Sequence, residues 1–166
     1  MDPDLAPEDI DPARPRQAPQ AAVLGVIALG GVAGAEARYE LGVAWPHTDG
    51  GWPWSTLVIN ITGCLLIGAL MVLVLEVFDA HPLVRPLLGV GVLGGYTTFS
   101  TYAVDALALI RTGHYGLLAG YLVGTPILAL AAAALGVRMC RAISSRVRSR
   151  DDGQDSDSEV TAEVTA

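Results

Sequence analysis

Residues 95–103 read GYTTFSTYA, and they lie inside a long stretch that carries no charge before Asp105. Four hydroxyl side chains alternate here with aromatic rings, in a place where a buried helix normally carries aliphatic residues. Two adjacent glycines, Gly94 and Gly95, come directly before or within this segment. Because glycine weakens a helix and hydroxyl groups compete for backbone hydrogen bonds, we expect a broken helix near residues 94–97.

The composition separates a charged periphery from an apolar centre. The chain has 166 residues, of which 52% are hydrophobic and 16% charged, with a formal net charge of −7. Most of the acidic residues fall in two tails, residues 1–20 and 141–166, which are too polar and too rich in Pro, Ser or Asp to bury a core. We therefore predict disordered tails on either side of one membrane domain, residues 21–140, with the C-terminal tail in the cytoplasm.

Four apolar segments fill the centre of the chain. Each approaches the roughly 20 residues that an α-helix needs to cross a bilayer, and none has the polar stripe of a soluble core helix. The segments run over residues 21–44, 55–75, 86–110 and 115–137. The sequence therefore predicts an all-α integral membrane protein with four transmembrane helices, the third of them broken near its centre. An acidic leader argues against a cleaved signal peptide at the first segment.

The arginines predict the orientation, since the chain has no lysine. Four spans place both tails on one side, together with the connector that carries Arg85, and this side holds eight of the ten arginines. Only Arg38 and Arg111 fall on the other side. The positive-inside rule then places the tails in the cytoplasm, as expected for a multi-pass protein of the cell membrane.

Few side chains at membrane depth could support catalysis. The three histidines lie in connectors, and no two of them have the spacing of metal ligands. Neither Cys64 nor Cys140 belongs to a C-x-x-C motif, and Asp105 is the only acid well inside the third segment. The sequence does not predict an enzyme.

Glycine spacing predicts close helix packing. Three G-x-x-x-G pairs, which let two helix backbones approach each other, occur at Gly30 and Gly34, Gly91 and Gly95, and Gly120 and Gly124. Ordinary packing explains most of these glycines. It does not explain why the pair Gly94–Gly95 is followed by four hydroxyl residues.

The polar residues of the spans favour an anion. A helix break frees backbone carbonyls that can hold a cation. On the helix that resumes, Phe99 and Tyr102 share a face, and the positive edges of their rings can meet an anion, although simple packing remains an alternative. Asn60 lies mid-span, while Tyr121 and Thr125 share one helix face. All three side chains donate hydrogen bonds, and none brings negative charge.

With these residues assembled, the chain resembles the CrcB/Fluc family of fluoride channels. The likeness covers roughly residues 23–139 and rests on three blocks in order: GGVAGAEARY at 30–39, STLVINITGCLLIG at 55–68 and GVLGGYTTFSTYAVD at 91–105. It implies two subunits of four helices, related antiparallel across the membrane and enclosing two pores. It also implies a structural Na⁺ at the dimer interface, bound by the backbone carbonyls of Gly94 and Thr97.

The resemblance also implies which residues form the pore. The positions assigned to the anion pathway are Asn60, Phe99, Thr101, Tyr102, Tyr121 and Thr125, and Arg38 matches the charged end of the first block. Two positions depart from the family pattern. Tyr102 stands where a second phenylalanine is usual, and Ala129 stands where a serine continues the polar track.

The implied function is passive export of fluoride from the cytoplasm, which lowers its toxicity. Hydrogen fluoride crosses bilayers uncharged and ionises inside, and a membrane potential that is negative inside drives the anion out at about 2.3 kcal/mol per charge per 100 mV. One alternative is a small dual-topology multidrug or cation exporter. Such an exporter needs a glutamate in the middle of the first span, whereas Glu36 lies toward its end. A second alternative is a membrane assembly subunit without transport activity.

The expected partners are fluoride, the lipid bilayer and a second subunit, with no nucleic acid. An antiparallel homodimer needs both orientations of one polypeptide, yet the arginines favour a single orientation. Either the chain inserts both ways and forms a homodimer, or it forms a heterodimer with an oppositely oriented homologue.

Overall fold

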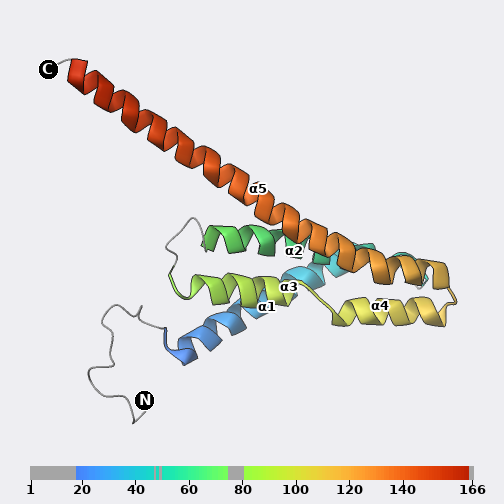
Figure 1. Ribbon diagram of the computed structural model, residues 1–166. Coiled ribbons are helices and arrows are strands. Elements are labelled where there is room, and N and C mark those ends of the chain that lie inside the picture. The colour runs from blue at the N-terminus through green and yellow to red at the C-terminus, as the bar shows by residue number, and fades with distance from the viewer. Residues whose placement is uncertain (1–17, 47, 49, 75–80, 165–166) are drawn as a thin grey trace, which may run out of the picture.

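Every regular element that the computed structural model describes is a helix. The described residues are 18–46, 48, 50–74 and 81–164, with side chains as far as Ser145. The elements are α1 (Gln20–Ala44), α2 (Trp54–Val72), the π-helical segment η3 (Pro86–Leu93), α3 (Gly94–Tyr96), α4 (Ser100–Arg111) and α5 (Tyr115–Val164) (Figure 1). Most of the predicted N-terminal tail lies outside these residues. Helix α5 continues through most of the predicted C-terminal tail, so the disorder of residues 141–166 stays a prediction.

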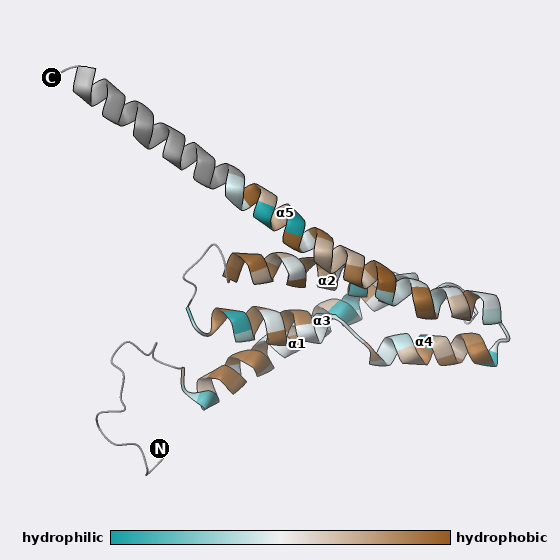
Figure 2. Ribbon diagram, in the orientation of Figure 1, coloured by the Kyte–Doolittle hydropathy of each residue, from teal (hydrophilic) through white to brown (hydrophobic). Residues whose placement is uncertain are grey.

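Three of the described helices are long and apolar enough to cross a membrane. They are α1, α2 and the Tyr115–Ser145 part of α5. Hydrophobic residues run along all three (Figure 2), and many face outward, with Leu29 and Leu130 each 72% exposed. Large apolar side chains on the outside of a helix are stable when lipid surrounds them. These helices and their exposed apolar surface are those of a membrane protein.

The third predicted span is divided, as expected for a broken helix. Its parts η3 and α3 precede the break and α4 follows it, and Thr97 has an extended backbone with φ −71° and ψ 155°. The break occupies residues 97–99, slightly later than the predicted 94–97. Gly94 and Gly95 remain helical, so the hydroxyl residues, rather than the glycine pair, lie at the break itself.

Two of the predicted glycine pairs pack against each other. A Cβ atom on Gly91 would lie 2.9 Å from the Ile27 carbonyl, and one on Gly95 would lie 2.5 Å from the Gly31 carbonyl. Gly30 and Gly34 on α1 face the same segment just as closely. Glycine has no Cβ atom, and this allows the backbone of α1 to lie directly on η3 and α3.

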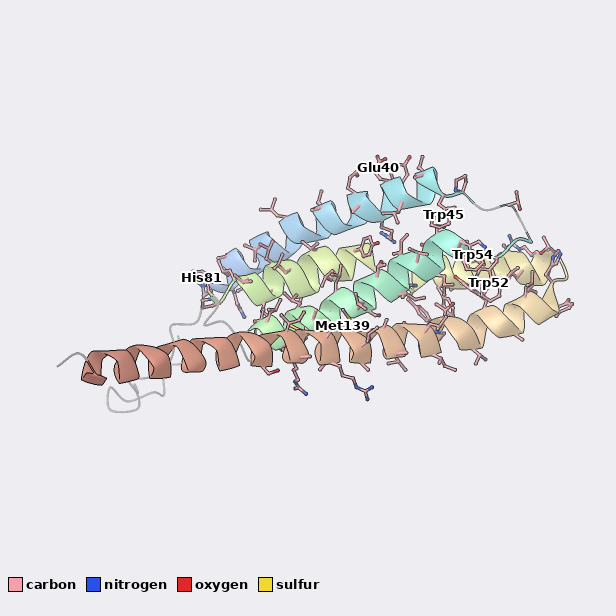
Figure 3. The ribbon with its side chains drawn as sticks, turned by 90° about the horizontal axis from the view of Figure 1, so that it is seen from above. Glu40, Trp45, Trp52, Trp54, His81 and Met139 are labelled. Carbon is pink, nitrogen blue, oxygen red and sulfur yellow. The ribbon has the colours of Figure 1, made fainter. Side chains whose placement is uncertain are left out.

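Helix α2 lies between this pair and α5 (Figure 3). Gly68 of α2 faces the Ala133 backbone, and Gly136 of α5 faces the Leu65 backbone. The third predicted pair is different, because Gly120 faces the ring of Trp52 and Gly124 has nothing within 4 Å among the described residues. Helix α2 thereby contacts both the break and α5, and it brings their polar residues together.

Candidate functional site

Asn60 binds the backbone at the break in the third span. Its Nδ2 donates to the Thr98 carbonyl at 2.9 Å, and its Oδ1 accepts from the Thr98 N–H at 2.8 Å. The side chain thus satisfies both backbone groups of one residue that has left the helix. An amide nitrogen carries two N–H groups, and the second has no partner among the described residues. Asn60 can hold the break open and still donate one hydrogen bond.

The break frees the two carbonyls that the family resemblance assigns to a cation. In a continuous helix, the N–H groups of Thr98 and Thr101 would donate to the carbonyls of Gly94 and Thr97, four residues earlier. Here Thr98 N–H donates to Asn60, and Thr101 N–H donates to Thr98 Oγ1 at 3.1 Å. Both carbonyls therefore lose their helical donors. Oxygen atoms of this kind suit a hard cation such as Na⁺.

Thr98 is the centre of the hydroxyl network that begins α4. Its Oγ1 donates to Thr101 Oγ1 at 3.0 Å and lies 3.2 Å from Ser100 Oγ. Its acceptance of the Thr101 N–H satisfies a backbone group in the first turn of α4, as a capping residue does. The predicted pore residue Thr101 is thus bound to Thr98, on the side of the break that faces α1.

A cavity of about 340 Å³ lies beside the break. Four of the predicted pore residues line it, together with the break itself and Ala129, and the residues with polar or aromatic side chains in its wall are Asn60, Thr97, Thr98, Phe99, Tyr102 and Thr125. Thr125 is only 3% exposed, and its Oγ1 is buried without a hydrogen-bond partner among the described residues. A buried hydroxyl without a partner is costly unless a ligand or water completes it. The cavity is therefore suited to a small polar occupant.

Three aromatic rings lie in contact one after another, from Phe99 and Tyr102 in the wall of this cavity to Tyr121 outside it. Phe99 and Tyr102 do share a face, with ring centroids 5.7 Å apart, and Tyr102 lies 5.0 Å from Tyr121. Phe99 is 79% exposed, whereas Tyr121 is completely buried. The Tyr102 hydroxyl donates to the Leu122 carbonyl at 2.9 Å. This bond fixes the orientation of a ring that lines the cavity.

Sequence reasoning assigned no role to a buried carboxylate at the far end of this series. Asp105 Oδ2 accepts from Thr56 Oγ1 at 2.6 Å and from the Tyr121 hydroxyl at 3.1 Å, and all three residues are buried. The sequence did carry a signal. Thr56 precedes Asn60 by four residues and so lies on the same helix face, and Asp105 is the one acid inside the third span. Tyr121 is thus bound to Asp105 and does not line the 340 Å³ cavity.

A second cavity, of about 410 Å³, lies on the other side of the break. Arg38 lines it together with the hydroxyl residues Ser55, Thr56, Thr98 and Thr101. Thr98 lines both cavities. None of the described residues that line either cavity is acidic, and apart from Arg38 their polar side chains are hydroxyls and an amide, each of which has an O–H or N–H to donate. Donors, a guanidinium group and ring edges together favour an anion.

The described residues contain no cluster of three or more His, Cys, Asp or Glu side chains that could bind a metal ion.

Curated relatives share most of this chain. A channel from Streptomyces coelicolor named fluoride-specific ion channel FluC 1 is 48% identical over 80% of this chain and 86% of its own length. The FluC 2 protein of Streptomyces avermitilis is 51% identical over 69% of this chain and 73% of its own. The FluC 2 protein of Nocardia farcinica is 48% identical over 72% and 86%.

A family model covers all the helices that build the site. The model described as CrcB-like protein, Camphor Resistance (CrcB), matches residues 25–137. This range begins in α1, includes the break and both cavities, and ends in α5 after Ala129. By this match and by the identity to its relatives, the chain belongs to the CrcB family.

Proposed function

We propose that this protein is a fluoride-selective channel that passively exports fluoride from the cytoplasm across the cell membrane. The observation that carries the proposal is the buried Thr125 hydroxyl, which has no partner among the described residues and belongs to a cavity lined by donors and ring edges. Fluoride is the smallest halide and a strong hydrogen-bond acceptor, so it fits such a site. The names of the relatives point to the same ion.

We assign the anion pathway to the two cavities and the residues between them. Arg38 attracts the anion into the larger cavity, and the hydroxyl of Thr101, which accepts from Thr98, is left to donate to the anion and replace part of its water shell. Asn60 donates its second amide N–H, and Thr125 donates its hydroxyl, in the smaller cavity. The ring edges of Phe99 and Tyr102 complete the shell with positive electrostatic potential. Tyr121 supports this wall through its contact with Tyr102.

Passive transport requires no energy-coupling site in the protein. The membrane potential contributes about 2.3 kcal/mol per charge per 100 mV, which expels an anion from a cell that is negative inside. The position of Glu36 toward the end of α1 does not favour a proton-coupled exporter, because that mechanism needs a carboxylate near mid-membrane. Export of this kind protects a cell from fluoride that enters as the neutral acid.

We propose that Na⁺ binds the freed carbonyls of Gly94 and Thr97 at the dimer interface. When bound, the ion supplies a fixed positive charge that neutralises the exposed carbonyl dipoles. Leu93 O already accepts from the Thr97 N–H and hydroxyl, both at 3.0 Å, so the Thr97 side chain is engaged and its carbonyl is left for the ion.

A second subunit completes the site. Phe99 is 79% exposed beside a break whose polar backbone cannot face hydrocarbon without a cover. An antiparallel partner would cover it and would bring a second set of pore residues. The partner is another copy of this chain or an oppositely oriented homologue, and S. avermitilis has relatives numbered both FluC 2 and FluC 3.

The test is fluoride efflux from liposomes. The purified chain is reconstituted in liposomes loaded with potassium fluoride, valinomycin is added, and external fluoride is recorded with an electrode. Rapid release of fluoride with retention of chloride in matched liposomes supports the channel. Proton-coupled export of an organic cation would favour the exporter, and folded protein that releases neither would favour an assembly subunit.

A further inference from the structure

Helix α5 contains a carbonyl group that its own backbone cannot satisfy. Pro126 lies inside this helix and has no backbone N–H. The Leu122 carbonyl, four residues earlier, therefore has no helical donor. Helix carbonyls point along the axis toward the C-terminus, so this oxygen points toward Pro126, and Pro126 lines the 340 Å³ cavity. An open carbonyl here would add negative potential beside the proposed anion pathway.

Tyr102 supplies the missing donor from a different helix. Its hydroxyl donates to the Leu122 carbonyl at 2.9 Å, a normal hydrogen-bond length. The bond joins α4, which resumes after the break, to α5 at the point where Pro126 interrupts the α5 hydrogen bonds. The ring also packs on Tyr121 at 5.0 Å and Phe99 at 5.7 Å. The hydroxyl and the ring of Tyr102 thus have separate partners.

We propose that Tyr102 is a positioning residue that masks the carbonyl left open by Pro126. The hydrogen bond removes a negative dipole from the anion pathway and holds the ring edge against the cavity. This inference rests on the proposed fluoride channel. It accounts for a hydroxyl at a position where a phenylalanine ring would offer the same edge, because the hydroxyl is needed where residue 126 is proline.

A double-mutant cycle tests the coupling between the two residues. Fluoride efflux is measured for the parent, Tyr102→Phe, Pro126→Ala and the double variant. In the parent background we expect loss of the hydroxyl to slow efflux by about threefold to tenfold, the effect of a carbonyl left without a donor beside the anion pathway. In the Pro126→Ala background the new alanine N–H satisfies Leu122. There, loss of the hydroxyl should slow efflux less than about twofold, because the carbonyl is already paired.

Equal effects of Tyr102→Phe in both backgrounds, or no effect in either, would overturn the proposal. If Pro126→Ala or the double variant folds poorly, two ring analogues at Tyr102 alone test the need for a donor. Replacing Tyr102 with 4-aminophenylalanine keeps a donor and should preserve efflux, whereas 4-methylphenylalanine keeps only the bulk and should behave as phenylalanine. If the parent itself passes no fluoride, the proposed function fails. The pairing of Tyr102 with Leu122 is then tested alone by the same cycle in thermal unfolding, where additivity would contradict it.

Discussion

At the scale of single residues, Tyr102 separates the role of a ring from the role of a hydroxyl. The ring lines the cavity beside Phe99, and the hydroxyl bonds to Leu122. A hydroxyl at this position could bind the ion, or it could anchor the ring to a neighbour such as Thr101 or Asn60. The structure favours anchoring, although to the Leu122 carbonyl, an acceptor exposed by the distant Pro126.

Replacing Tyr102 tests whether a ring edge meets the anion. We expect Tyr102→Phe to conduct within about tenfold of the parent, equivalent to no more than about 1.4 kcal/mol in the barrier. Tyr102→Ile has similar apolarity but no ring edge, so it should lose most of the flux. The measurement is fluoride efflux from liposomes containing monodisperse protein. An isoleucine variant that conducts as fast as the parent would reduce Tyr102 to a packing residue.

Asn60 combines a structural and a conducting role. We expect Asn60→Asp to lower fluoride efflux by at least about tenfold, since a carboxylate repels an anion at close range. A carboxylate oxygen would also face the Thr98 carbonyl, which now accepts from Asn60 Nδ2. Cys64→Ala is the matched control, four residues along α2 in the same cavity wall. Near-normal flux in Asn60→Asp would remove Asn60 from the pathway.

At the scale of elements, the third span is a helix interrupted by side-chain hydrogen bonds, one from α2 and one from within the span itself. The Thr98 N–H donates to Asn60 Oδ1 of α2, and the Thr101 N–H donates to the Thr98 hydroxyl. These two bonds displace the helical donors of Gly94 and Thr97. The break thus results from competing side chains, and a break of this kind at membrane depth is stable only where it faces protein, water or an ion.

The sodium proposal makes opposite predictions for its two residues. Thr97→Ala should keep Na⁺ binding, because the proposed ligand is a backbone oxygen. Gly94→Leu should lose it, since a bulky side chain beside the proposed ligand carbonyl would crowd the ion; among the described residues, a Cβ atom there meets only the Gly89 carbonyl at 3.8 Å. The measurement is the shift in melting temperature when sodium is exchanged for N-methylglucamine. Equal sodium-dependent shifts in both variants would count against the site.

The contact of α1 with α3 can be tested at a single glycine. We expect Gly95→Ala to destabilise the protein by about 1–3 kcal/mol, because its Cβ would lie 2.5 Å from the Gly31 carbonyl. Gly31→Ala is the control on the opposing helix, where a Cβ meets nothing within 4 Å among the described residues. Thermal unfolding in detergent measures both. Similar stability in the two variants would show that the helices can separate without cost.

The sequence predicted the helices better than the side-chain contacts between them. Apolar length predicted the spans, and glycine spacing predicted close helix packing, which α1 and η3 show, since both depend on local pattern. The break lies at 97–99 because it depends on Asn60, which comes from another helix. Pairing of Asp105 with Thr56, and of Tyr102 with Leu122, joins residues 49 and 20 positions apart. Patterns within one segment do not specify such contacts.

At the scale of the whole molecule, the arginine distribution favours a single orientation in the membrane, whereas an antiparallel homodimer needs both orientations of the chain. Helix α1 begins, and α2 ends, at the end of the molecule toward which α5 runs (Figure 1). Eight of ten arginines belong to the side that the tails occupy in a four-span arrangement. We predict that a reporter fused to Ala166 is cytoplasmic. An external reporter would contradict the arginine rule for this chain, and a mixed signal would favour a homodimer with both orientations.

The most direct test of the account is the reversal potential of the purified chain in a planar bilayer, with unequal fluoride concentrations on the two sides and chloride making up the difference. A fluoride-selective pore carries a current that reverses close to the fluoride equilibrium potential, without ATP or a proton gradient. We predict this result for the chain reconstituted alone or with an oppositely oriented homologue. A reversal potential near zero, or folded protein that carries no current under either condition, would contradict a fluoride-selective channel.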